Sequence, residues 1–464
     1  MDTLTFRNMD QTESFGRLTT LTKPVELSAY LTNERIASYS IPTGGGLTYN
    51  YAAKQVNDEI IGSLGALAEE QQLISKYRAI TEGEIMNPSE NRKVMHHLTR
   101  VQLSKDVLHN GQNLRTFYTE QQRRIGEFAA KVHEGSIRGS TGKAFDTVVQ
   151  IGIGGSDLGP RALYLALKHY RQNGHPIEKM KARFISNVDP DDAKSIIDSI
   201  NPETTLFIIV SKSGTTQETL TNKDLITETL KKSGIPGFRP EQHFIAVTSE
   251  TSPMAGSSEY IKSFYIDDFI GGRYSSTSAV GAAVLTLAFG EEVFAQLLEG
   301  AHDTDKAALQ TDIRKNPCLM DALIGVYERN ILGYPCTAIL PYSQALQRFP
   351  AHLQQLDMES NGKQVNREKE PISYPTGPVV FGEPGTNGQH SFYQLLHQGT
   401  DIIPLQFIGF KEPGADFDLD LDQGTSQRKL NANLAAQITA FALGKQDKDP
   451  NKNFPGDRPS TTLV

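Results

Sequence analysis

Two apolar stretches, each followed at once by small and hydroxyl residues, constrain the fold of this chain most strongly. The first is TVVQIGIGGSDLGP at 147–160, and the second is LFIIVSKSGTTQET at 206–219. Each pattern predicts a buried strand, a loop and then a helix. From Asp146 onward, further β-rich runs alternate with helical segments in the same way: ARFISN, HFIAVT and SFYID. This alternation predicts a parallel, doubly wound sheet.

A second set of strand-like runs follows a long helical stretch between Ser278 and Tyr334. Its members are TAILPYS, PVVFGEP and DIIPLQFIGF. We therefore expect two α/β domains, each an αβα sandwich, at residues 116–290 and 291–464. Residues 1–115 are expected to form a helical segment that packs with the second domain.

Composition excludes several classes of protein. The 464 residues carry a net charge of −8, which argues against nucleic acid as the main partner. With two cysteines and no metal-ligand spacing, the chain fits a reduced cytoplasm and no metal site. It has no apolar run of membrane-spanning length and no leader-like start, so we expect a protein without a membrane partner.

Both glycine and hydroxyl loops have the chemistry of a phosphate cradle. Glycine lets a ligand approach the backbone, Ser and Thr donate hydrogen bonds, and the following helix directs its positive end at the same place. Neither loop has the GxxxxGK[ST] pattern, which favours a small phosphorylated metabolite over a nucleoside triphosphate. The alternative is a turn that only lets a helix pack on a sheet. A nucleotide-dependent oxidoreductase is disfavoured, because Asp157 stands where GxGxxG needs its third glycine.

The second half of the chain supplies candidate proton carriers. Glu359 lies in QQLDMESNGK and His390 in GEPGTNGQHSFYQLLHQG, both expected to be irregular loops. Arg273, in GGRYSS, adds a fixed positive charge suited to a developing oxyanion. The alternatives are a surface charge for Glu359, a structural role for His390 and an interdomain salt bridge for Arg273. We expect His397 to be structural and the pair at 96–97 to lie on a helix surface or a subunit contact.

Several segments resemble the signature segments of the phosphoglucose isomerase family. They are GIGGSDLGPRAL, SKSGTTQET, GGRYSSTSAVG, QQLDMESNGK and GEPGTNGQHSFYQLLHQGT, with NPSENRKVMHHLTR and FPGDRPSTTLV nearer the two ends. The resemblance implies two sugar-isomerase-type domains in a cytoplasmic homodimer. It implies interconversion of glucose 6-phosphate and fructose 6-phosphate in glycolysis and gluconeogenesis, by ring opening and a cis-enediol, with no cofactor.

The resemblance also implies a role for particular residues. Glu359 matches the catalytic base, His390 the residue that assists ring opening, and Arg273 the residue beside the reacting carbons. The residues that would hold the phosphate are Ser156, Ser211, Lys212, Ser213 and Thr216. Four others fall in the same pocket: Gln217 and Glu218, with Gly155 and Gly272 allowing the sugar to approach the main chain. The alternatives are helix capping for Ser211 and Thr216 and a solvated charge for Lys212.

Family chains continue beyond the FPGDRPSTTLV segment into helices that carry a catalytic glutamine and lysine. This sequence stops at Val464, so those two residues have no counterpart in it. The alternative hypothesis is therefore a sugar-phosphate-binding module with little or no catalytic activity.

Overall fold

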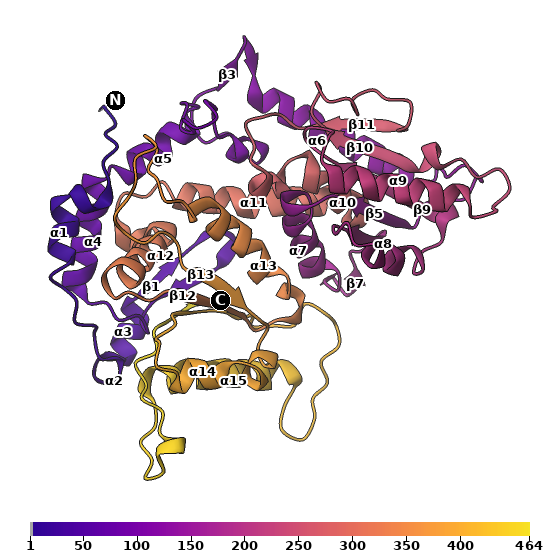
Figure 1. Cartoon of the computed structure of the whole chain (residues 1–464). Coiled ribbons are helices and arrows are strands. Elements are labelled where there is room, and N and C mark those ends of the chain that lie inside the picture. Colours follow the sequence, from indigo (N-terminus) through magenta and orange to yellow (C-terminus); the bar gives the residue numbers. More distant parts are fainter. Residues whose placement is uncertain (1–2) are drawn as a thin grey trace. The chain divides into compact units, whose positions relative to one another are not determined.

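The computed structural model describes residues 3–464. The chain divides into two compact units, each built on its own sheet (Figure 1). Unit 2 is Ile80–His302, and unit 1 takes in the chain up to Ala79 and again Asp303–Val464. Both units are α/β structures, as the alternation of strand and helix patterns predicts.

The sheet of unit 2 has five strands in the order β11-β10-β9-β5-β8, and every neighbouring pair is parallel. The order reverses direction around β5, which is the signature of a doubly wound sheet. In this sheet Val149 of β5 pairs with Phe207 of β9 and with Arg183 of β8. The strands are β5 (Thr147–Ile151), β8 (Lys181–Ile185), β9 (Thr205–Val210), β10 (Phe244–Thr248) and β11 (Lys262–Tyr265).

Helices cover both faces of this sheet. Alternate residues of β9 contribute to different cores, with Ile208 on one face and Phe207 on the other. This follows from the two-residue period of a strand. One face packs against α6 (Leu114–His133), α7 (Leu158–Leu167) and α10 (Ala279–Phe289), and the other against α8 (Pro190–Ile197) and α9 (Gln217–Lys231). All residues of α10 are buried, which explains why it is the most apolar stretch of the chain.

The sheet of unit 1 has six strands in the order β1-β2-β15-β14-β12-β13. Four of them are parallel, while β1 and β2 add an antiparallel edge. The register places Thr462 of β15 opposite Asn50 of β2. The strands are β1 (Ser40–Pro42), β2 (Thr48–Asn50), β12 (Cys336–Pro341), β13 (Val379–Gly382), β14 (Leu405–Ile408) and β15 (Ser460–Leu463).

Two hydrophobic cores stabilise unit 1. In the first, Leu340 of β12 and Phe407 of β14 pack with α14 (Tyr393–Gln398) and α15 (Ser426–Leu443). In the second, the helices of the N-terminal segment pack with α12 (Pro317–Val326). The other helices of this unit are α1 (Glu13–Leu18), α2 (Leu27–Tyr30), α3 (Asn33–Ser38), α4 (Asp58–Glu70) and α13 (Phe349–Gln354).

Four short elements and two helices complete the chain. Two hairpins lie in unit 2, one made of β3 (Leu108–His109) and β4 (Gln112–Asn113), the other of β6 (Arg171–Gln172) and β7 (His175–Pro176). Helices α5 (Leu73–Thr81) and α11 (Glu291–Ala307) each contain a point where the chain passes from one unit to the other. In the part of the chain that the structure describes, no helix is long and apolar enough to cross a membrane.

The unit boundaries differ from the predicted borders at 115 and 290. Residues up to 79 belong with the second sheet, but 80–115 belong to unit 2. The reason is a small core in which Met95, Leu98 and Val107 pack with Tyr118 of α6. The later boundary lies at 302 because Phe294 and Leu298 of α11 belong to the first core of unit 2. Both packing surfaces involve residues distant in sequence, which periodicity alone does not reveal.

His243 is fully buried in unit 2 and is held as a neutral ring. Its Nε2 accepts a hydrogen bond from the backbone N–H of Ser140 at 3.0 Å, so its Nδ1 carries the proton that is donated to the Thr205 carbonyl at 2.9 Å. Burial lowers the pKa of His243, and it also lowers the pKa of His97 to about 4 and that of His96 to about 3. Each of these buried rings therefore stabilises the folded state only in its neutral form.

We expect acid to destabilise the protein through these histidines. Their folded-state pKa values lie below the ordinary value of 6.5, so their contribution is complete above about pH 6.5 and is lost as pH falls toward each folded pKa. Each group lowers the free energy of unfolding by up to about 1.4 kcal/mol per pH unit in that range. Thermal unfolding between pH 7 and pH 5 measures this effect. His243→Gln should lower stability at pH 7 but make its fall with pH shallower, and an unchanged slope would contradict this account.

Candidate functional site

The loop after β9 organises its hydroxyl groups around the start of α9. Ser211 Oγ lies 2.9 Å from Thr216 Oγ1 and accepts a hydrogen bond from the N–H of Gly214 at 3.1 Å. Thr216 occupies the residue before α9, yet its side chain does not cap the helix. The hydroxyls of Ser211 and Thr216 therefore bond to each other, which disfavours the capping alternative. The N–H groups of the first turn of α9 carry the positive end of the helix dipole at this loop.

The remaining residues of this loop lie nearer to solvent. Ser213 is exposed and its Oγ accepts from the N–H and the hydroxyl of Thr215, at 3.2 and 2.9 Å. Gln217 and Glu218 form the first turn of α9, with Gln217 exposed and Glu218 half-buried. The predicted phosphate-binding residues 211, 213 and 216 thus lie in one short loop. The predicted pocket residues 217 and 218 follow it directly in the first turn of α9.

The loop after β5 lies beside the loop after β9, because β5 and β9 are neighbouring parallel strands. Ser156 follows β5 in the turn Gly154–Ser156, and its carbonyl accepts from the side chain of Gln150 at 2.7 Å. A Cβ on Gly152 would lie 3.2 Å from the carbonyl oxygen of Val210, the last residue of β9. Both loops therefore occupy the same carboxyl edge of the sheet, where ligands bind in doubly wound folds.

Gly155 and Gly272 lie against each other. A Cβ on Gly155 would fall 2.1 Å from the carbonyl carbon and oxygen of Gly272. Ser275 Oγ joins the two turns, with its hydroxyl 2.7 Å from the Gly272 carbonyl and 3.2 Å from the Gly155 carbonyl. The resemblance gave these glycines the role of admitting the sugar. The structure gives Gly155 a second reason to lack a side chain, which is the close packing of two backbone segments.

Arg273 is half-buried in the turn Gly272–Thr277, next to this glycine contact. Its neighbour Tyr274 stacks on His96, with ring centroids 4.4 Å apart. His97 is only 1% exposed. The expectation that these two histidines lie on a helix surface or a subunit contact is therefore wrong for His97. Packing of the 80–115 segment against unit 2 is what buries it.

Lys212 faces a carboxylate that the sequence analysis missed. Its Nζ lies 3.6 Å from Oδ1 of Asp268, and the same oxygen lies 3.7 Å from Arg92 Nη1. Asp268 stands in the segment between β11 and Arg273, so it links the SKSGTT loop to the arginine turn. An isolated aspartate in a loop gives no sequence signal of this role. The solvated-charge alternative for Lys212 is thus replaced by a partly exposed ion pair.

Glu359 lies on a helix and not on the irregular loop that we expected. Helix α13 continues into a π-helical turn, Gln355–Glu359, of which Glu359 is the last residue. The helix forms because Phe349, Leu353 and Leu356 recur at helical spacing. The side chain of Gln354 donates to the Val380 carbonyl at 3.1 Å, which ties this helix to β13. Glu359 is therefore an exposed carboxylate on a fixed helical support.

His390 ends the short 3-10 turn Asn387–His390, beyond the carboxyl end of β13, and it is exposed. Its neighbour Gln389 exchanges hydrogen bonds with Asn433 of α15, at 3.2 and 3.4 Å. Tyr342 OH also donates to Asn433 at 3.1 Å. The turn that carries His390 is thus positioned by α15 through side-chain amides.

His397 has the structural role that we expected. Its ring stacks on Phe441 at a centroid distance of 3.7 Å, and its Nε2 lies 3.1 Å from Oε1 of Gln437. Burial lowers the pKa of His397, so the ring stays neutral near pH 7. Within residues 3–464, no group of three or more His, Cys, Asp or Glu is arranged to hold a metal ion.

The candidate residues fall into two sets. Unit 2 brings together the two hydroxyl loops, Lys212 and the turn of Arg273 at the carboxyl edge of its sheet. Unit 1 carries Glu359 and His390 on elements that adjoin β13. The sequence profile described as phosphoglucose isomerase matches residues 50–464, nearly all of the chain, including every member of both sets.

The chain belongs to the phosphoglucose isomerase family. It is 56% identical to the glucose-6-phosphate isomerase of Treponema denticola over 99% of this chain and 87% of that protein. It is 46% identical to the enzyme of the same name from Borreliella burgdorferi, again over 99% of this chain and 87% of the other. A crystal structure of a glucose-6-phosphate isomerase from Chlamydia trachomatis has a TM-score of 0.91 with this fold, at 41% identity, covering 99% of this chain and 87% of that one.

The loops after β5 and β9, which carry two of the quoted segments, occupy the carboxyl edge of the unit 2 sheet, and the segment with His390 follows β13 in unit 1. The remaining question is how the reaction is divided among the residues of this chain.

Proposed function

We propose that this chain interconverts glucose 6-phosphate and fructose 6-phosphate, and that its two sets of residues divide the work. The residues at the carboxyl edge of unit 2 hold the phosphate, and Glu359 and His390 of unit 1 move the protons. The observation that supports this proposal most is the hydroxyl loop at the start of α9. The side chain of Thr216 does not cap α9, so the backbone N–H groups at the start of this helix donate no hydrogen bond to Thr216.

Three kinds of group at the carboxyl edge of the unit 2 sheet bind the phosphate. The hydroxyls of Ser156, Ser211 and Thr216 donate hydrogen bonds, the start of α9 adds its dipole, and Lys212 adds a positive charge. Lys212 is paired with Asp268 at 3.6 Å, which holds its ammonium group at the loop. A bound phosphate attracts the same ammonium group. Anchoring the remote phosphate fixes the reacting carbons in place.

Isomerisation needs one base that serves two neighbouring carbons. After the ring opens, Glu359 takes the proton from C2, and a cis-enediolate forms. The proton returns to C1 while a hydroxyl proton passes from O2 to O1, which converts the aldehyde at C1 into a ketone at C2. The guanidinium of Arg273 stabilises the negative charge that develops on oxygen. His390 moves the proton between the ring oxygen and the C1 hydroxyl during ring opening.

We further propose that the enzyme works as a homodimer in the cytoplasm. The two cysteines at 318 and 336 are free thiols, which suits a reducing compartment. Sedimentation of the purified chain measures the oligomeric state directly.

The phosphate assignment predicts a specific loss in one variant. Thr216→Val removes a hydroxyl but keeps the shape of the side chain. We expect kcat/KM for fructose 6-phosphate to fall by about tenfold or more, since a hydrogen bond to a charged group contributes about 1.5–3 kcal/mol. Inhibition by inorganic phosphate should weaken by a similar factor, because the same hydroxyl binds both anions.

Thr215→Val is the matched control, because the hydroxyl of this exposed neighbour bonds within the loop, to Ser213. We expect its kcat/KM to stay within about twofold of the parent, as for other surface substitutions. Equal losses in the two variants would show that the loop is perturbed generally, and would contradict a phosphate contact from Thr216.

A further inference from the structure

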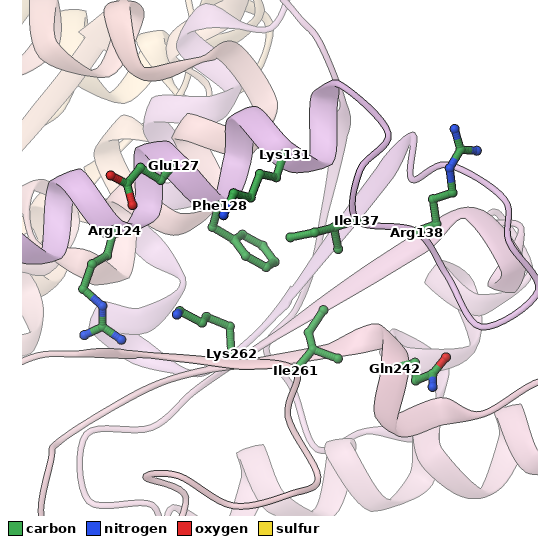
Figure 2. Close-up of a pocket in the computed structure, with 9 residues that line it drawn as sticks. All are labelled: Arg124, Glu127, Phe128, Lys131, Ile137, Arg138, Gln242, Ile261 and Lys262. Atoms are coloured by element: carbon green, nitrogen blue, oxygen red, sulfur yellow. The ribbon is translucent and has the colours of Figure 1, made fainter.

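A pocket of about 370 Å³ lies on unit 2 away from both hydroxyl loops. It is bounded by α6, by the segment after α6 and by the start of the edge strand β11 (Figure 2). The pocket and the hydroxyl loops lie at opposite edges of the unit 2 sheet. Lys262 begins β11 and Gln242 precedes β10, so the pocket lies at the amino ends of parallel strands. The hydroxyl loops follow the carboxyl ends of β5 and β9.

One side of the pocket is apolar. Phe128 of α6 lies beside Ile137 and Ile261 (Figure 2). Phe128 is 6% exposed and Ile261 is 36% exposed. Ile261 therefore contributes most of the accessible part of this apolar side.

The other side of the pocket is positively charged. Arg124 and Lys131 of α6 and Lys262 of β11 gather on the same side of Phe128 (Figure 2). Arg124 is fixed, because its Nη2 donates to the Ser263 carbonyl at 3.0 Å and its guanidinium lies 5.3 Å from the Tyr265 ring centroid. In the described chain, Lys131 and Lys262 form no ion pair within 4.0 Å.

One carboxylate, that of Glu127, also lines the pocket. It pairs with Arg123, which lies outside the lining and also pairs with Glu120. Four basic side chains thus line the pocket of a chain whose net charge is −8, and the fourth, Arg138, points away from Phe128 (Figure 2). Bringing cations together costs free energy unless an anion joins them.

We propose that this pocket binds a small aromatic ligand that carries a phosphate dianion. Its volume lies within the range of ligand sites, about 300–1,000 Å³. The phosphate contacts Lys131, Lys262 and Arg124, while the ring packs on Phe128 between the two isoleucines. This site is separate from the proposed sugar-phosphate loops and takes a ligand whose body is apolar.

The test uses phenyl phosphate as the probe, with fructose 6-phosphate present at saturation so that the catalytic loops are occupied. Calorimetric titration of the full chain should give a dissociation constant of about 1 mM or tighter. Inorganic phosphate and phenol should each bind at least about tenfold more weakly, because each offers only half of the contacts. No binding of phenyl phosphate would overturn the proposal. Loss of binding at saturating fructose 6-phosphate would also overturn it, since the probe would then belong to the catalytic loops.

The double variant Lys131→Gln/Lys262→Gln should weaken phenyl phosphate by about tenfold or more. The matched control is Lys231→Gln/Lys232→Gln, which removes the same charge from exposed positions at the end of α9. It should change binding by less than about twofold. If both double variants lost the same affinity for phenyl phosphate, the effect would come from net charge alone. That result would contradict binding at this pocket.

A second measurement needs no variant. Hydrogen exchange of the parent chain with phenyl phosphate should slow in 124–138 and 261–265, the segments that line the pocket. Protection confined to 154–156 and 211–217 would instead place the probe in the hydroxyl loops and contradict the proposal.

Discussion

Glu359→Gln is expected to lower kcat by about 10³-fold or more, because general base catalysis by one positioned side chain contributes up to about 10⁴-fold. Glutamine keeps the size and the hydrogen-bonding groups of the side chain but has no charge with which to take a proton. The residues of unit 2 that we propose to hold the phosphate are untouched, so KM should stay within a few-fold. An assay that couples glucose 6-phosphate formation to its oxidation measures both constants.

Glu368→Gln is the matched control for this prediction. Glu368 is an exposed glutamate of the same unit, 3.6 Å from Arg367, and it belongs to neither candidate set. Its kcat should stay within about twofold of the parent, as expected for a surface substitution. If Glu359→Gln retained comparable turnover, a different group would have to be the base.

The largest expected effect on stability comes from Lys54. Its Nζ lies 2.9 and 3.0 Å from the two carboxylate oxygens of Glu328, and both side chains are almost wholly buried. Burial raises the pKa of Glu328, and the positive charge of Lys54 opposes this rise. Lys54→Met leaves a buried carboxylate with no cation, which should lower the free energy of unfolding by about 3–5 kcal/mol. Urea unfolding measures this loss.

Two further variants separate charge from packing at this pair. Lys54→Met/Glu328→Leu removes both charges, so most of the lost stability should return. Lys194→Met breaks an exposed pair on α8, in which Nζ lies 2.7 Å from Asp198, and should cost less than about 1 kcal/mol. If the double variant were as unstable as Lys54→Met alone, the loss would come from packing and not from the unpaired carboxylate.

Much of unit 2 could be predicted because its signals are local. An apolar run followed by glycine and hydroxyl residues specifies a buried strand and a loop. Strand β5 begins at the predicted residue, and β9 begins one residue before it. The loops after these strands share one edge because the strands are parallel neighbours, which the alternation with helices also predicts. The position of the two hydroxyl loops thus follows from sequence patterns alone.

The parts that escaped prediction depend on contacts between distant residues. Strands β1 and β2 have three residues each, and β2 pairs with β15 from the far end of the chain, where Leu463 lies opposite Tyr49. Asp268 meets Lys212 only because β11 returns the chain to the edge of the sheet. No periodicity reports such pairings, since they arise from the tertiary structure.

Two other features were not predicted from the sequence. Glu359 was expected on a loop because Asp, Ser, Asn and Gly surround it, but the apolar spacing from Phe349 to Leu356 extends the helix as far as Glu359. The packing of Gly155 on Gly272 was also not foreseen, because it joins residues more than a hundred positions apart. The residue types of these segments indicated which chemical groups they carry, but not the conformation of the backbone.

The most direct test of proton transfer by Glu359 is isotope exchange in heavy water. The purified chain is incubated with fructose 6-phosphate, and the recovered sugars are examined by NMR for deuterium at C1 and C2. Transfer through a carboxylate predicts that deuterium enters these positions in the parent and that Glu359→Gln abolishes its entry. Formation of glucose 6-phosphate with no uptake of deuterium from solvent at either position would indicate a hydride shift from C1 to C2 and contradict the account.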